Sequence, residues 1–182
     1  MRNVCFRALA VPAMVLALSS AAFAQQSVTL ADTSQTTTLT ATVLEQARVV
    51  VPAGIAFNVG DVTANTAASG ASVSVQNIVL STATKQLKVS IQANAASFTP
   101  PAVGAATWSA SDVTWNAAAW TNATGSTGTL SNAAYNTVAT CAAAAADCST
   151  TGLVFTLGAK PAVSRAGDHT LVVTWKFESI GS

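Results

Sequence analysis

The single histidine of the chain, His169, directly follows Asp168 and lies close in sequence to Ser164. These are the residue types of a catalytic base, an orienting carboxylate and a nucleophile. Neighbouring side chains on a strand point to opposite faces, however, so Asp168 is poorly placed to orient the His169 ring. No strand–turn–helix nucleophile motif surrounds the serine. The pattern favours a turn histidine, exposed or engaged in capping, and we expect the chain not to be an enzyme.

The acidic residues are scattered singly along the chain, at Asp32, Glu45, Asp61, Asp112, Asp147, Asp168 and Glu178. Calcium loops concentrate carboxylates at alternate positions, and these residues do not. The glycines form no phosphate-binding loop. We therefore expect no metal and no cofactor. A hydrolase whose carboxylates meet only in the folded protein stays open as an alternative.

Two of the three cysteines, Cys141 and Cys148, lie close together in sequence, whereas Cys5 lies near the N-terminus. In an oxidising compartment the simplest interpretation of the close pair is one disulfide that closes a short loop. The spacing is not the Cys-x-x-Cys of redox pairs. The histidine is far away in sequence, which argues against a metal site.

Three tryptophans, Trp108, Trp115 and Trp120, lie among small and polar residues. They are candidates for an exposed platform that stacks on sugar rings. The other interpretation is that they fill the core, because only 6% of the residues are aromatic. Trp115 and Trp120 also differ in parity, so one extended strand would not present both on the same face. We favour packing roles and keep carbohydrate binding as the alternative.

Residues 1–24 have the three parts of a secretory signal peptide. Arg2 and Arg7 give a positive start, residues 8–18 are apolar, and the segment ends in Ala22-Phe23-Ala24. This pattern predicts cleavage after Ala24. A membrane anchor is the alternative, but 11 apolar residues fall short of the roughly 20 that span a bilayer. We expect export to the periplasm, cell surface or extracellular space, with no membrane span after cleavage.

Charge is scarce, since only 8% of the residues are Asp, Glu, Lys or Arg. The formal net charge is +1 and becomes −1 once Arg2 and Arg7 are cleaved off. Without a basic excess, nucleic acid is not an expected partner. The 51% of apolar residues argue against a disordered chain. Residues 25–182 have a suitable length for one domain with a core.

Apolar and polar residues alternate with a period of two in several segments, which is typical of strands with one buried face. The apolar sets are Leu87–Ala93, Leu171–Phe177, Leu153–Leu157, Ile55–Val59, Val73–Val75 and Leu39–Val43, with further strands expected near 49–51, 106–115 and 135–140. A change of parity predicts a bulge near Gln76-Asn77. The turn at 166–168 suggests a hairpin between the Leu153 strand and the last strand.

Many short strands and no long helix predict an all-β fold, an antiparallel two-sheet sandwich of the immunoglobulin-like type with about seven to nine strands. Residues 25–182 are expected to form this single domain. The Thr-rich segment 25–42, in which Val28 and Leu30 alternate with polar residues, is expected to be an extended arm. Such an arm can add a strand to a neighbour's sheet edge.

The signal peptide, the alternating strands, the short cysteine loop and the closing strand Gly167–Trp175 together resemble bacterial secreted immunoglobulin-like proteins, of which fimbrial subunits and spore-coat-U-like proteins are the nearest group. Unlike pilins completed by a donor strand, the chain carries a strong last strand, and it lacks the pilin C-terminal signature. The resemblance implies an exported structural or surface protein that associates with itself or with other surface proteins. A carbohydrate-binding module acting on polysaccharide remains the alternative.

Overall fold

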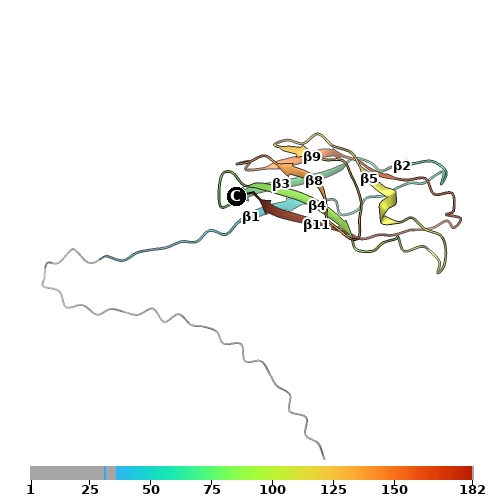
Figure 1. The fold of residues 1–182 in the computed structure, drawn as a ribbon, viewed down its shortest axis with the longest axis horizontal. Helices are drawn as coiled ribbons and strands as arrows, with labels where there is room; N and C mark the ends of the chain where they lie inside the picture. The colour runs from blue at the N-terminus through green and yellow to red at the C-terminus, as the bar shows by residue number, and fades with distance from the viewer. Residues whose placement is uncertain (1–30, 32–35, 182) are drawn as a thin grey trace, which may run out of the picture. The chain divides into compact units, whose positions relative to one another are not determined.

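The computed structural model describes residue 31 and residues 36–181. The predicted signal peptide at 1–24 and most of the predicted arm at 25–42 therefore lie outside the described residues. From Thr42 onward the chain forms one compact unit, which we call the body (Figure 1).

Eleven strands of the described residues pair into three antiparallel sheets. The first sheet has the order β1-β3-β9, with bounds Gln46–Val50, Ala71–Val79 and Cys148–Leu153. The second has the order β2-β10-β5-β7, with bounds Thr66–Ala67, Phe155–Leu157, Val113–Trp115 and Gly128–Thr129. The third has the order β11-β4-β8-β6, with bounds Val173–Ile180, Gln86–Ala93, Asn136–Cys141 and Ala123–Gly125. A 3₁₀ turn, η1 at Ala110–Asp112, precedes β5, and the described residues contain no α-helix.

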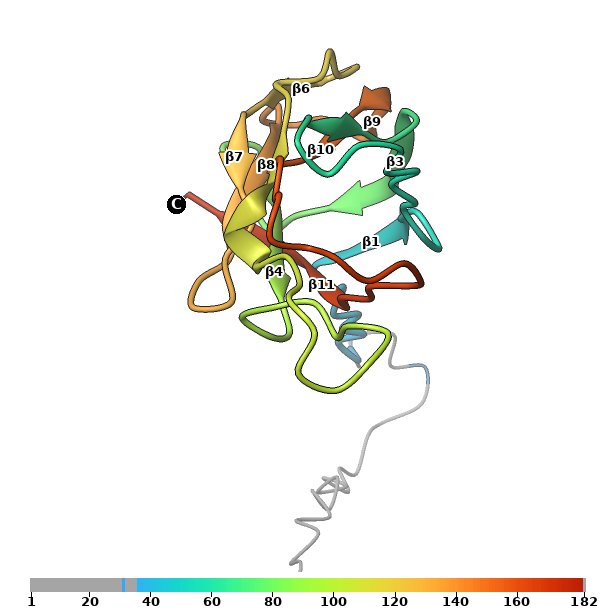
Figure 2. The same ribbon diagram turned by 90° about the vertical axis from the view of Figure 1, so that its right-hand side faces the viewer.

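The all-β prediction is confirmed, but the structure has three sheets and eleven strands where the sequence predicted two sheets and seven to nine strands. The number of sheets differs because two long strands are each interrupted by a few residues. Val154 alone separates β9 from β10, and residues 68–70 separate β2 from β3. Because β3 pairs with β9 and β2 with β10, the first two sheets follow one another along the same chain segments. Viewed end-on, β4 and β8 lie on one side of the body and β1, β3 and β9 on the other, as in a sandwich (Figure 2).

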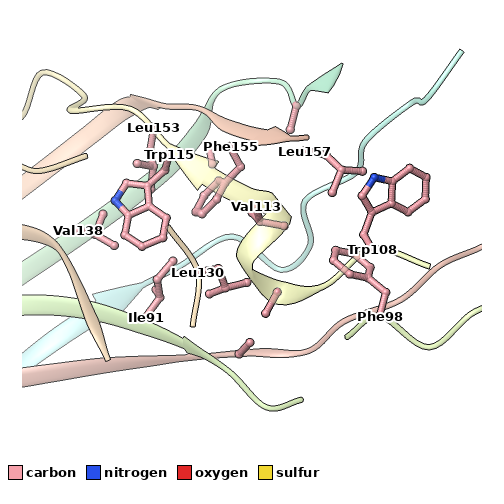
Figure 3. Packing of buried hydrophobic residues seen from close by; sticks show 14 of the residues in the cluster. Ile91, Phe98, Trp108, Val113, Trp115, Leu130, Val138, Leu153, Phe155 and Leu157 are labelled. Carbon is pink, nitrogen blue, oxygen red and sulfur yellow. The ribbon is translucent and has the colours of Figure 1, made fainter. Parts of the chain in front are cut away.

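The main core lies between these layers and is built from the apolar faces of the strands (Figure 3). Its largest members include Ile91, Trp108, Val113, Trp115, Leu130, Val138, Leu153, Phe155 and Leu157. Burying one such aliphatic or phenyl side chain stabilises a fold by about 1.5–3 kcal/mol. A second, smaller cluster contains Val75, Leu87, Val89 and the two cysteines of the body. The predicted inward faces of β4, β9 and β10 are thus confirmed.

The predicted bulge near Gln76-Asn77 is also confirmed. The pairing of β1 with β3 shifts register between Gln46 and Arg48, and Asn77 adopts a positive φ of 52°. A second register shift lies between Val89 and Ser90, where β4 pairs with β8. Ser90 is buried there although its parity predicted the polar face.

Three predicted elements differ from the structure. Residues 55–59 join no sheet, although Ile55, Phe57 and Val59 are half-buried and the residues between them are exposed. The predicted hairpin between the Leu153 strand and the last strand is wrong, because β10 belongs to the second sheet and β11 pairs with β4 in the third. The predicted strand Leu39–Val43 is not formed, and Leu39 is 91% exposed. Alternation reports which side chains can be buried, but a strand also needs a partner for its backbone.

Candidate functional site

His169 makes hydrogen bonds and a ring contact, and it is not part of a catalytic triad. Its Nε2 donates to the carbonyl oxygen of Arg165 at 3.2 Å, and its Nδ1 is hydrogen-bonded to the Thr107 hydroxyl at 2.7 Å. The ring also meets Trp108 edge-on, with centroids 5.1 Å apart. Asp168 and Ser164 are exposed, and neither binds the ring. His169 is therefore a half-buried histidine that links its own segment to Thr107 by hydrogen bonding.

The described carboxylates of the body are dispersed and bind separate partners. Asp112 accepts from Lys160 at 2.6 Å, Asp147 accepts from Asn122 at 2.8 Å, and Asp61 binds Thr63 in its own turn. Within the described residues, no three His, Cys, Asp or Glu side chains gather into a group able to hold a metal ion. Burial by itself would raise the pKa of Asp112, but the hydrogen bonds from Lys160 and Ser109 outweigh burial and lower it.

Cys141 and Cys148 form a disulfide, with their Cα atoms 5.8 Å apart. Cys141 ends β8 and Cys148 begins β9, so the bridge closes the turn between strands of the third and first sheets. Both cysteines are buried in the smaller core cluster. The bridge is therefore a structural link between two layers.

The tryptophans face inward. Trp108 and Trp115 are 4% and 3% exposed, and the Nε1 of Trp108 donates to the Gly158 carbonyl oxygen at 2.8 Å. Trp120 is half-buried and packs against the main core. These positions agree with the packing interpretation. Trp108 and Trp115 are too buried to stack on a sugar ring, whereas Trp120 keeps part of its surface exposed.

A groove of about 990 Å³ opens on the body at a place that the sequence did not reveal. One wall is the segment after β1, residues 51–62, and the other is the approach to β11, residues 163–175. Its floor is made of core side chains, namely Phe98, Trp108, Val113, Leu130, Phe155 and Leu157. These floor side chains are themselves only 3–9% exposed, so the groove runs over the outer surface of the core.

The walls of the groove expose backbone as well as apolar side chains. Residues 53–60 join no strand, and no backbone hydrogen bond ties them to the rest of the described chain. Ile55, Phe57 and Val59 turn toward the core on one wall, and Leu171 and Val173 do so on the other. The second wall is partly tied down, because Thr170 exchanges backbone hydrogen bonds with Thr99 and the carbonyl oxygen of Val172 accepts from Asn94.

An ion pair lies near the start of the body, just before β1. The carboxylate of Glu45, one residue before β1, accepts from the Lys85 ammonium and from the Ser81 backbone N–H, each at 2.8 Å. Val43 and Leu44, just before it, are 72% and 76% exposed. The hydrogen bonds from Lys85 and Ser81 lower the pKa of Glu45 to about 2. We call these contacts of Glu45 the clamp.

A second carboxylate, Glu178 on β11, binds Lys176 at 2.8 Å and Lys88 at 2.9 Å. These hydrogen bonds lower its pKa from 4.5 to about 2. A carboxyl whose pKa is lowered by folding stabilises the protein above its unfolded pKa and stops doing so as the pH falls through the folded value. The stabilising effects of Glu45 and Glu178 should therefore be lost between about pH 4.5 and pH 2.

Urea unfolding at pH 5, 3.5 and 2.5 tests this expectation. The denaturation midpoint of the wild type should fall over this range, and the Glu178→Gln variant should show a shallower fall. High salt should reduce the difference, because both pairs are exposed to screening. Parallel pH profiles of variant and wild type would contradict the assignment.

A scan against protein-family models, a search of curated proteins and a search of solved structures found no significant match. Within the part of the chain that the structure describes, no helix has the length and apolarity needed to cross a bilayer. Alternation at Ile55–Val59 was the only sequence signal for the groove, and no signal marked Glu45.

Proposed function

We propose that this chain is an exported, non-enzymatic structural subunit of a surface assembly, of the fimbrial or coat-like kind. In this proposal the first two sheets act as one interrupted layer that faces the third, as in an immunoglobulin-like sandwich. The arm of one copy, residues 25–42, adds a strand in the groove of the next copy. The observation that carries the proposal is the groove itself, whose floor is the hydrophobic core.

The shape and lining of the groove favour an extended strand over a compact ligand. Both walls are chain segments that lie mostly outside the strands, and residues 53–60 offer unpaired backbone groups along one of them. A strand supplies backbone partners together with side chains that alternate between the groove and solvent. The arm has this pattern, because Val28 and Leu30, and again Leu39 and Ala41, alternate with polar residues.

Glu45, just before β1, and the groove lie toward opposite ends of the body, which favours assembly in a head-to-tail chain. Glu45 is held at the β3–β4 connection, near the end where Gln86 pairs with Ile180. The groove begins at Val51, which follows the far end of β1. It also includes the residues just before Val173, at the opposite end of β11 from Ile180. A contact between two different patches of the same subunit does not close on itself unless its rotation forms a ring, so it generates filaments.

Substitution of a groove wall tests the proposal on the mature chain, residues 25–182. Leu171→Lys places an ammonium where the added strand would lie, because Leu171 is a half-buried wall residue. Val103→Lys is the matched control, since Val103 is fully exposed and lies outside the groove. Light scattering and electron microscopy should show large assemblies for the wild type and the control and mainly monomers for Leu171→Lys.

The melting temperature of each variant monitors folding in that experiment. A wild-type protein that stays monomeric at every concentration would refute the proposal. Equal assembly by Leu171→Lys and wild type would refute the role of the groove. Deletion of residues 25–41 should prevent assembly while leaving the body folded, because the chain from Thr42 onward is a compact unit by itself.

A further inference from the structure

Within the described part of the chain β11 is an edge strand, because the order of its sheet is β11-β4-β8-β6. The side chains on its inward face show the effect of a missing neighbour. Val89 and Ile91 in β4 are completely buried. Phe177 and Trp175, which pair with them in β11, are only half-buried. Two aromatic side chains of the core thus keep apolar surface along this edge that a further strand would cover.

The free edge of β11 also offers backbone hydrogen-bonding groups. The carbonyl oxygen of Val172 accepts from the N–H of Asn94, which precedes the register of β11 on β4 by one position. Successive residues of an antiparallel strand bond alternately to one side and the other. The even-numbered residues of β11 therefore bond to β4, and the residues that direct their N–H and C=O groups to the free edge are Val173, Trp175, Phe177 and Ser179. Such a row of groups is a template for another strand.

Two opposite charges on the outward face of β11 distinguish among the possible partners. Lys176 and Glu178 lie two residues apart. If two copies of β11 pair antiparallel with Phe177 opposite Phe177, then Lys176 of each copy lies opposite Glu178 of the other. The odd-numbered residues meet as hydrogen-bonded pairs in this register. The charged residues meet as non-hydrogen-bonded pairs, whose side chains are closer together.

The two neighbouring registers place like charges opposite each other. Centring the pair on Lys176 would oppose the two Lys176 ammonium groups, and centring it on Glu178 would oppose the two carboxylates. Opposite charges directly across a strand pair stabilise it, and like charges destabilise it. The sequence of β11 therefore specifies one register for pairing with itself.

We propose that β11 pairs with β11 of a second copy about a twofold axis at Phe177, which joins two four-stranded sheets into one continuous sheet. The contact spans residues 174–180 and closes on itself, because both copies use the same patch. It is separate from head-to-tail assembly, since Phe177 and Ser179 lie outside the groove. One short strand pair buries little surface, so the dimer is weak and forms at high protein concentration.

Disulfide trapping tests the contact and its register in the mature chain, residues 25–182. In the proposed register Thr174 of one copy lies opposite Ile180 of the other, with Cα atoms about 4.5 Å apart, a separation that a disulfide can bridge. The Thr174→Cys/Ile180→Cys variant, which we call the trapping variant, should form a covalent dimer on mild oxidation. The two new thiols of one copy cannot meet, because strand geometry separates them by about 20 Å.

Val172→Cys/Ile180→Cys is the matched control and leaves both charges of β11 in place. Its thiols would lie opposite each other only in the register centred on Lys176. In the proposed register they are diagonal neighbours, about 7–8 Å apart, which is too far for an unstrained disulfide. The control should give several-fold less covalent dimer than the trapping variant. The melting temperature of each reduced protein monitors folding.

Charge reversal supplies a second readout. Lys176→Glu in the trapping variant places carboxylates opposite each other and should lower the yield of dimer about two- to thirtyfold, the range for two cross-strand charge pairs. Lys160→Glu is the control, because Lys160 also binds a carboxylate, that of Asp112, but lies away from β11. It should leave the yield unchanged.

A mixing experiment separates charge pairing from damage to the strand. Glu178→Lys is made together with Lys88→Glu, so that the internal pair between β4 and β11 is kept with its signs reversed. This variant should also trap poorly by itself. An equimolar mixture with the Lys176→Glu variant should recover the covalent dimer, because every new carboxylate then lies opposite an ammonium group.

Three results would overturn the inference. One is a trapping variant that stays monomeric, as expected if another segment of the chain already covers this edge. The others are equal yields from the trapping variant and its control, and a yield that Lys176→Glu does not change. Each result is independent of the proposed function, because Leu171→Lys alters the groove outside residues 174–180 and should leave trapping as it is.

Discussion

Alanine at Gly128 is expected to destabilise the protein by about 1–3 kcal/mol, the usual cost of forcing an extra group into a packed core. Gly128 in β7 pairs directly with Trp115 in β5. A Cβ at Gly128 would lie 2.7 and 2.8 Å from Cε2 and Cη2 of the Trp115 ring and would also contact Cζ2. Trp115 is enclosed on its other sides by the main core, so the ring has little space to move.

A double-mutant cycle with Trp115→Phe makes this expectation specific. The smaller ring removes the atoms that the new Cβ would meet, and it removes an Nε1 that has no hydrogen-bond partner within the described chain. The two substitutions together should therefore cost less than the sum of their separate costs. Urea unfolding measures the four free energies.

Gly152→Ala is the control for the Gly128 substitution. The closest atom to its new Cβ is the Thr150 hydroxyl at 4.0 Å, an ordinary contact. The change in the free energy of unfolding should stay within about 0.5 kcal/mol, as is usual for exposed sites. A loss at Gly152 as large as that at Gly128 would show that the cost comes from the backbone and not from Trp115.

Removal of the disulfide is expected to lower the free energy of unfolding by about 2–3 kcal/mol. The chain-entropy model gives this value for a loop as short as that between Cys141 and Cys148. Alanine at both positions is the suitable variant, because each cysteine is buried among apolar residues and serine would place an extra hydroxyl there.

Denaturant unfolding with and without a reducing agent separates the covalent contribution from the packing contribution. The wild type should lose stability in reductant, whereas the double alanine variant should show the same midpoint in both buffers. A wild type that is insensitive to a reductant strong enough to open the bridge would contradict the expected contribution. Free-thiol titration on the unfolded protein confirms the state of the bridge.

The strands with regular alternation could be predicted from the sequence, because one face of each meets the core. Leu87, Val89 and Ile91 show this in β4, and Leu153, Phe155 and Leu157 show it in β9 and β10. Sheet membership could not be predicted in the same way. Whether β11 pairs with β4 or with the Leu153 strand depends on contacts between residues far apart in sequence, and local turn residues at 166–168 suggested the wrong partner.

The candidate site was harder to predict than the fold. The tryptophan pattern allowed both burial and exposure. Trp108 contacts Gly158 and His169, which are far away in sequence, so these contacts could not be predicted from the sequence around Trp108. The groove depends on a strand that Ile55, Phe57 and Val59 could have formed but for which the body has no partner. The clamp joins Glu45 to residues 36 and 40 positions away, a distance over which a single sequence carries no signal.

The floor of the groove has a consequence for how the stability of this protein should be understood. Trp108, Val113 and Leu157 belong to the main core and also line the groove, so the groove lies directly against the main core. A strand that occupies the groove adds to the same hydrophobic cluster that holds the fold together. If the proposed assembly forms, folding and association are linked equilibria, and the melting temperature should rise with protein concentration.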